Sequence, residues 1–134
     1  MLRRFSCRLS IFIFIFRHIV SVADSAGRVS IFALRSGARL AGPFALPANV
    51  SMLESNEWRC LAVLTTGALR LWDTKPPGAP TCLIAVDELP LLRDNERIRR
   101  CFISECGAPV VVSSLCHSFM YSTKLQTWYA TKIL

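Results

Sequence analysis

Hydrophobic and polar positions alternate along this chain in short runs that end at turn residues, a pattern typical of β-strands. The clearest example is residues 61–73. An apolar run at 61–64 is followed by Thr-Thr-Gly, in which Gly67 can adopt the positive φ of a tight turn. Strict alternation then continues to Trp72-Asp73. This stretch predicts a β-hairpin with apolar residues on both faces of its second strand.

The same pattern recurs along most of the chain, and Gly27 and Gly67 are 40 positions apart. That interval approaches the ~40–45 residues of a WD-type propeller blade. A third hairpin joins 110–112 to 119–121, after a polar interval at 87–100, and has Leu115-Cys116-His117 where a turn glycine is expected. The further strands that we predict are 19–23, 29–34, 38–42, 49–54, 58–65, 81–86, 101–104 and 125–130.

These strands predict an all-β fold of about three WD-like propeller blades, each an antiparallel meander, with the first set of strands incomplete. A closed propeller needs ~4–8 blades, so three blades form an incomplete propeller. Each blade buries its faces against its neighbours, and an unclosed set leaves apolar faces uncovered. Hydrophobic residues make up 52% of the chain and the mean hydropathy is +0.40, which excludes an intrinsically disordered chain.

The first 17 residues differ from the rest, because Arg3, Arg4 and Arg8 precede an apolar run at 9–16. Three interpretations stay open: a secretory signal or membrane anchor, a buried strand, or a start outside the folded unit from a truncated or misassembled gene model. The run is shorter than the ~20 residues that span a bilayer. We therefore divide the chain into an N-terminal segment at 1–17, whose membership of the fold stays open, and a β domain at 18–134.

The net charge of +7 is unevenly distributed. Residues 1–50 hold seven arginines and one acid, which gives +6, whereas residues 51–134 hold nine basic and eight acidic residues, which gives +1. The larger part of the chain is thus nearly neutral, and we expect no specific DNA site.

The residues that could carry chemistry do not form a recognisable catalytic or metal-binding set. Cys60, Cys82, Cys101 and Cys116 lie in or beside apolar runs, where we expect free, buried thiols in a reducing compartment. A zinc site could draw only on Cys101, Cys106, Cys116 and His117, which lack the usual spacing. Neither histidine has a convincing nucleophile and carboxylate beside it, and no phosphate-binding loop is present. We expect no enzyme activity, no cofactor, no metal and no small-molecule substrate.

Five segments, in this order and with this approximate spacing, resemble the C-terminal domain of the HIRA/Hir family of histone-regulation proteins. The segments are 46–54, 61–73, 89–92, 107–112 and 125–128. The resemblance covers about residues 18–130. It implies a WD-type β domain that serves as a non-catalytic scaffold or assembly module of a nuclear histone chaperone complex. That complex would act in replication-independent nucleosome assembly and in transcriptional repression.

The resemblance also implies the partners: other subunits of the histone chaperone complex, a second copy of the chain, and histones indirectly. The alternative is a WD-repeat protein-interaction module unrelated to histones. A real signal at residues 1–16 would instead make the protein secretory or membrane-associated.

Four residues are candidates for contact with a partner: Arg97, Arg99, Arg100 and Trp128. Each also has a purely structural interpretation. The arginines belong to a mixed-charge interval that could be a solvated loop or a short exposed helix, and Trp128 could belong to the core of a blade.

Overall fold

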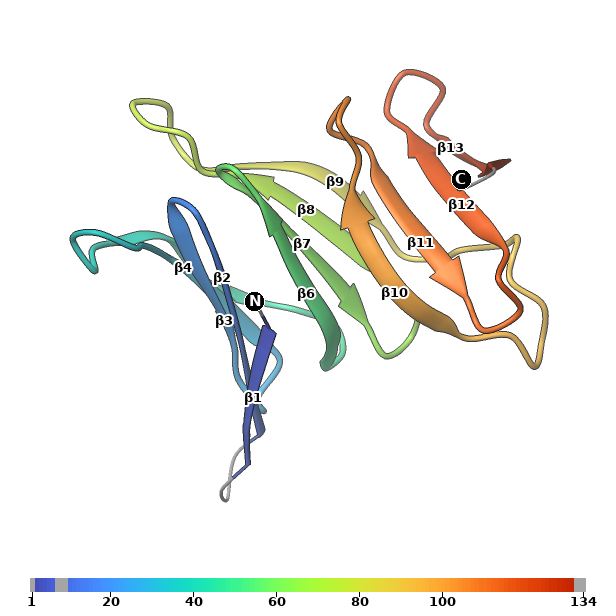
Figure 1. Cartoon of the computed structure of the whole chain (residues 1–134), viewed down its shortest axis with the longest axis horizontal. Coiled ribbons are helices and arrows are strands. Elements are labelled where there is room, and N and C mark those ends of the chain that lie inside the picture. The colour runs from blue at the N-terminus through green and yellow to red at the C-terminus, as the bar shows by residue number, and fades with distance from the viewer. Residues whose placement is uncertain (1, 7–9, 132–134) are drawn as a thin grey trace.

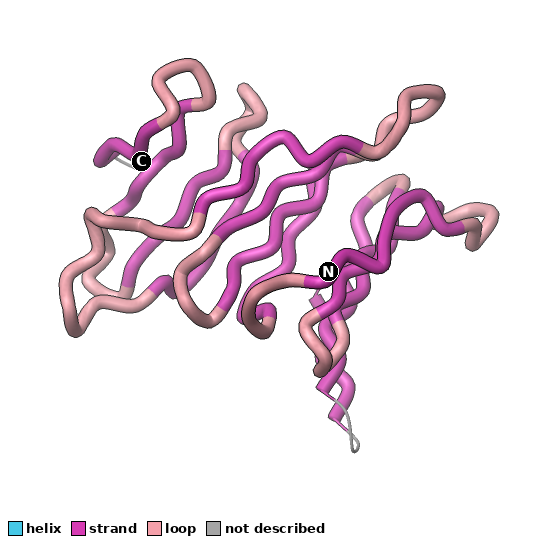
Figure 2. The backbone as a smooth tube through the Cα atoms, turned by 180° about the vertical axis from the view of Figure 1, so that it is seen from behind, coloured by secondary structure: helices cyan, strands magenta, loops and turns pink. Residues whose placement is uncertain are grey.

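The computed structural model describes residues 2–6 and 10–131, and within these ranges the chain forms strands and loops without a helix (Figures 1 and 2). The predicted all-β class is therefore confirmed. Arg8 and the C-terminal end of the 18–134 domain, residues 132–134, lie outside the described residues.

The strands form three sheets, each an antiparallel meander in which consecutive strands pair. Blade 1 has the order β1-β2-β3-β4-β5, with bounds Leu2–Ser6, Ser10–Phe16, Ile19–Ala23, Arg28–Ala33 and Arg39–Ala45. Blade 2 is β6-β7-β8-β9, with bounds Val50–Asn56, Arg59–Leu64, Leu69–Asp73 and Thr81–Val86. Blade 3 is β10-β11-β12-β13, with bounds Ile98–Ile103, Pro109–Ser113, Ser118–Ser122 and Thr127–Thr131.

The three blades stand side by side as an open fan, with blade 2 in the middle (Figure 1). Strands β2 and β3 contact β6, and β10 contacts β6 and β7. The first strand of each four-stranded meander thus lies toward the same side of the fan, as the inner strands of propeller blades do. The arrangement is an incomplete propeller, as the sequence predicts.

The hairpin at residues 61–73 is the joint between β7 and β8. Its turn is closed by hydrogen bonds from the Gly67 amide to the Leu64 carbonyl, 2.9 Å, and from the Leu64 amide to the Ala68 carbonyl, 2.8 Å. Gly67 has φ +89°, in the left-handed region that favours glycine. The predicted hairpin is confirmed.

The equivalent turn of blade 3 keeps this geometry without a glycine. The Cys116 amide donates to the Ser113 carbonyl at 3.0 Å, and Cys116 itself has φ +63°. In blade 1 the Gly27 amide donates to the Asp24 carbonyl at 3.2 Å, with φ +76°. The lost glycine therefore weakens the sequence match but not the structural repeat.

Two sequence predictions about the elements are wrong. Blade 1 is not incomplete, because Ser10–Phe16 pairs with β3 along its length and supplies the missing strand. The interval 93–100 is neither all loop nor helix: β10 begins at Ile98, so Arg99 and Arg100 belong to a strand. Hydrophobic alternation could not place this start, because a register shift between Ile98 and Arg100 interrupts it.

The N-terminal segment therefore contributes two strands to the structure, β1 and β2. Among the described residues, no helix is long and apolar enough to cross a membrane. The division between 1–17 and 18–134 stays a prediction.

Two hydrophobic clusters join the blades, and blade 2 takes part in both. On β8, Trp72 faces blade 1 and stacks on Phe44 with ring centroids 5.0 Å apart, whereas Leu69 and Leu71 belong to the cluster shared with blade 3. Full burial of a leucine or valine contributes roughly 1.5–3 kcal/mol relative to exposure. The core therefore lies on both faces of blade 2.

Candidate interaction surface

Neighbouring blades are also joined at one end by their two-residue turns. Arg17 donates to Glu57 at 2.8 Å, and the His18 ring stacks on Trp58 with centroids 4.6 Å apart. These residues occupy equivalent turns, between β2 and β3 and between β6 and β7. On the other side of blade 2, the Arg59 guanidinium donates to the Gly107 carbonyl of blade 3 at 3.3 Å. This end of the fan is held by contacts within the chain.

The opposite end of blade 3 contains a polar network around Glu96. This carboxylate lies in the loop before β10, and its side chain is fully buried. It accepts hydrogen bonds from the Ser113 hydroxyl and from the Arg93 amide, 3.1 Å, and its Oε2 lies 2.8 Å from His117 Nδ1. The hydrogen bond from Ser113, followed by that from the Arg93 amide, lowers the pKa of Glu96.

The Glu96 network fixes the interval 87–97 against the turn between β11 and β12. Two further hydrogen bonds support it, from the Arg97 amide to Ser114 Oγ at 3.1 Å and from the Ser114 amide to the Arg97 carbonyl at 2.7 Å. The sequence alone did not predict this network. Alternation places Ser113 on the same face as buried Val111, and a polar side chain in that position needs a buried partner.

The Glu96 carboxylate contacts Ser113, the Arg93 amide and His117, and it forms no ion pair with the described arginine side chains around it. Arg93, Arg97, Arg99 and Arg100, the arginine cluster, are all exposed, and Asp94 is the exposed acid among them. Within the described residues, none of the four makes an ion pair. Arg100 instead lies over the Phe102 ring at 5.4 Å, and its charge acts on Glu54.

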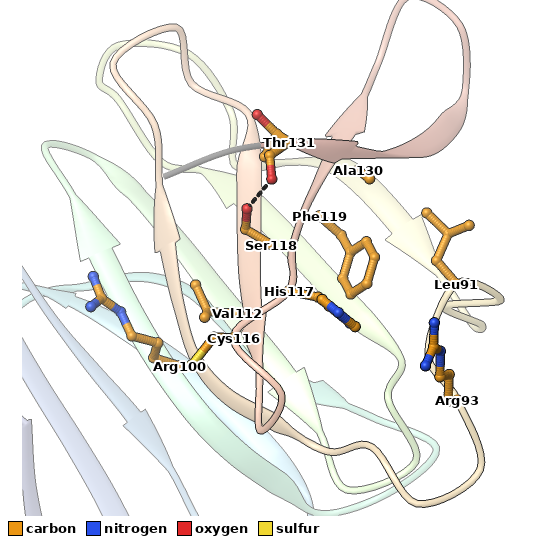
Figure 3. Close-up of a pocket in the computed structure, with 10 residues that line it drawn as sticks. All are labelled: Leu91, Arg93, Arg100, Val112, Cys116, His117, Ser118, Phe119, Ala130 and Thr131. Carbon is orange, nitrogen blue, oxygen red and sulfur yellow. Dashed lines mark hydrogen bonds between the residues drawn. The ribbon is translucent and has the colours of Figure 1, made fainter. Parts of the chain in front are cut away.

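A pocket of about 720 Å³ lies beside the cluster at the β11–β12 hairpin (Figure 3). Figure 3 shows Arg100 and Cys116 on one side of this hairpin and Arg93, Leu91 and His117 on the other, so the lining wraps around its end. The Ser118 hydroxyl donates to the Thr131 carbonyl within this region. The full lining is Leu91, Arg93, Arg100, Val112, Cys116, His117, Ser118, Phe119, Ala130 and Thr131.

The structure separates the four candidate residues into two groups. Arg97, Arg99 and Arg100 lie on the surface, whereas Trp128 is 8% exposed and packs in the cluster between blades 2 and 3. Its ring meets Tyr121 edge-on at 5.3 Å. Its indole N–H is buried and has no hydrogen-bond partner among the described residues. This packing favours the core interpretation of Trp128 over an exposed contact.

The cysteines are only partly where the sequence predicts them. Cys60 and Cys101 are buried free thiols, and burial raises the pKa of each to about 12. Cys82 and Cys116 are exposed, which corrects the prediction. Cys82 is exposed because it lies on the outer strand β9 of blade 2. Cys116 is exposed because it lies in the turn between β11 and β12.

Each histidine lies beside a glutamate carboxylate. His18 lies against Trp58 and Glu57, and the Ser113 hydroxyl donates to Glu96 instead of to His117. Cys106 is exposed in the turn before β11, and its hydrogen bond with Ser104 lowers its pKa. Across the part of the chain that the structure describes, no group of three or more His, Cys, Asp or Glu side chains could hold a metal ion.

Three comparisons with known proteins agree with one another. The family model described as Hira, TUP1-like enhancer of split, matches residues 37–132. Protein HIRA of Xenopus laevis is 29% identical over 114 residues, which cover 84% of this chain and 11% of that protein. The crystal structure of HIRA(644-1017) aligns with a TM-score of 0.70 at 20% identity, covering 91% of this chain and 44% of that one.

These comparisons differ in what they establish. At 20% identity the crystal structure shows likeness of fold alone. The family match covers most of the chain, from the turn before β5 to the last strand. The chain spans only 11% of the length of the Xenopus protein.

Proposed function

The chain belongs to the Hira family, and on this premise we propose that it serves as a non-catalytic assembly module of a histone chaperone complex. The observation that carries this proposal is the family match, which covers residues 37–132 and so includes all of blades 2 and 3. In this proposal the protein is nuclear and contributes to replication-independent nucleosome assembly and to transcriptional repression.

The open fan supports a role in assembly, because within residues 2–6 and 10–131 the outer faces of blades 1 and 3 have no blade packed against them. In blade 1, Val20, Val22 and Phe32 point away from blade 2 and are half-buried. In blade 3, Val112 and Met120 do the same. Contiguous apolar surface of this kind marks protein interaction sites.

The partners that we propose are other subunits of the complex and a second copy of the chain, with histones reached through those subunits. Such partners would cover the apolar faces as neighbouring blades cover them in a closed propeller. The position of Ser113 supports a non-catalytic role, since its hydroxyl donates to Glu96 instead of to His117.

The test is affinity purification of the tagged full chain from nuclear extract, followed by identification of the proteins that remain bound. We expect subunits of a histone chaperone complex and core histones. Val20→Asp and Met120→Asp, one on each open face, should lower the recovery, whereas Lys124→Asp on an exposed turn should not.

Two results would contradict the proposal. Recovery of proteins unrelated to chromatin would favour a WD-repeat interaction module with other partners. Delivery of the tagged chain to the secretory pathway would contradict the nuclear localisation.

A further inference from the structure

We infer that the arginine cluster of blade 3 is a docking surface for an acidic protein segment that also carries apolar side chains. The partner would be one of the proteins with which the proposed assembly module associates, so this inference rests on the proposed function and adds the chemistry of recognition.

The arginine side chains of blades 2 and 3 differ in whether they form ion pairs with acidic side chains of the chain. In blade 2, Arg59 lies 3.7 Å from Asp73, and Arg70 lies 2.9 Å from Asp87 and also donates to two backbone carbonyls. In blade 3, Arg97 and Arg99 are exposed and make no ion pair with any described residue. Arg59 and Arg70 of blade 2 are thus paired within the chain. Arg97 and Arg99 of blade 3, like Arg35 and Arg39 of blade 1, are exposed without an ion pair to any described residue.

Glu96 lies among these arginines in the sequence but makes no ion pair with the described ones. Its carboxylate is buried and its oxygens accept hydrogen bonds from Ser113 and the Arg93 amide, with His117 beside them. Glu96 therefore has its hydrogen-bond partners inside blade 3, and Asp94 is the exposed acid among the arginines. A carboxylate-rich partner would complement the remaining positive charge.

Exposed apolar side chains beside the arginine cluster favour a peptide over a nucleic acid as its partner. Leu91 is 40% and Leu115 is 48% exposed, and both flank the cluster in the sequence or in the β11–β12 turn. Single-stranded nucleic acids bind through exposed aromatic rings on which bases stack. Of the rings near this site, Phe102 is half-buried beneath the Arg100 guanidinium and Phe119 is buried, while the His117 ring lies with its Nδ1 against Glu96. Exposed leucines beside arginines fit a segment that alternates acidic and apolar side chains.

The experiment measures binding of a fluorescent synthetic peptide of alternating Glu and Leu to the full chain by anisotropy. The variant is Arg97→Glu with Arg99→Glu. The matched control is Arg35→Glu with Arg39→Glu, which makes the same change in net charge at two exposed arginines of blade 1 that also lack an ion pair among the described residues. Circular dichroism and thermal melting establish that each variant is folded, and Arg97→Gln with Arg99→Gln replaces the first variant if it is not.

We expect the wild-type chain to bind the Glu-Leu peptide and the blade 3 variant to lose at least about tenfold in affinity, since it places like charges together. The blade 1 control should lose less than about threefold, because its charges are distant and screened by salt. A Gln-Leu peptide should bind more weakly than the Glu-Leu peptide.

Four results would overturn the inference: no binding of the Glu-Leu peptide, equal losses in the two variants, equal binding of the Gln-Leu peptide, or tighter binding of a single-stranded DNA oligonucleotide. The proposed function is tested separately by the purification from nuclear extract. A chain that recovers chaperone subunits but ignores the Glu-Leu peptide would therefore retain the proposed function and lose this surface.

Discussion

Blades 2 and 3 are built on the same four-stranded meander, but they differ in how much of each is covered. In β7 of blade 2, the five residues from Cys60 to Leu64 are each at most 1% exposed. In blade 3 the face toward blade 2 is buried. On the other face Val110 is 1% exposed, but Val112 and Met120 are half-buried and Tyr129 is 42% exposed. Because the two blades share the same strand order, the difference in burial comes from position: blade 2 has a neighbour on each face, whereas blade 3 has one neighbour among the described residues.

The largest expected effect is the loss of a core side chain that blade 2 shares with blade 3. Leu71→Ala should lower the free energy of unfolding by about 2–5 kcal/mol, because Leu71 is 1% exposed and its loss leaves a cavity. Val112→Ala, on the open face of blade 3, should cost less than about 1 kcal/mol. Urea denaturation of the two variants measures both values, and equal losses would contradict the contrast between the blades.

A smaller effect is expected from exchanging the turn residues of the two blades. Cys116→Gly should stabilise the chain by about 1 kcal/mol, because Cys116 has φ +63°, a conformation that costs a residue with a side chain. Gly67→Cys should destabilise it by a similar amount, about 1 kcal/mol. A Cβ on Gly67 would meet no atom within 4 Å, so that cost is conformational.

Denaturation midpoints of these two variants give the comparison directly. Opposite signs would establish that the turns are equivalent. A destabilised Cys116→Gly would instead show that the thiol side chain contributes more than its backbone conformation costs.

The smallest effect concerns pH and the network that ties the 87–97 interval to blade 3. The pKa of Glu96 is lowered in the folded state, so the unfolded state binds the proton more readily. The resulting stability is present above the ordinary glutamate pKa of about 4.3 and is lost as the pH falls through the lower, folded value. Glu96→Gln should therefore flatten the acid side of the stability profile.

The measurement is the melting temperature between about pH 7 and about pH 3 for the wild type, for Glu96→Gln and for Asp94→Asn. Asp94 is the control because it is an exposed acid two residues away. Were both variants to alter the acid side equally, the buried network would not be its source.

The sequence predicted those parts of the fold that depend on local patterns. Gly67 and the alternation after it located the central hairpin, and the interval of 40 residues located its counterpart at Gly27. The sequence did not show that Cys116 adopts the positive φ typical of glycine. The paired strands on either side of the turn hold Cys116 in this conformation despite its conformational cost, and a local sequence pattern does not reveal that constraint.

The candidate surface was less predictable than the fold. The sequence identified Arg97, Arg99 and Arg100 but gave no sign that Glu96 is buried against Ser113 and His117. Those contacts join positions 17 and 21 residues apart, and only the folded sheet brings them together. The exposure of Cys82 was missed for a related reason, since burial of an outer strand depends on what lies beyond it.

The most direct test of the central claim is hydrogen–deuterium exchange of the full chain, alone and within the complex recovered from nuclear extract. We predict that the amides of β7 and β8 exchange slowly in both states, whereas strands of blades 1 and 3 gain protection only in the complex. Blade 3 strands as protected as β7 in the free chain, or unchanged by the complex, would contradict the claim that the outer blades present surfaces to partners.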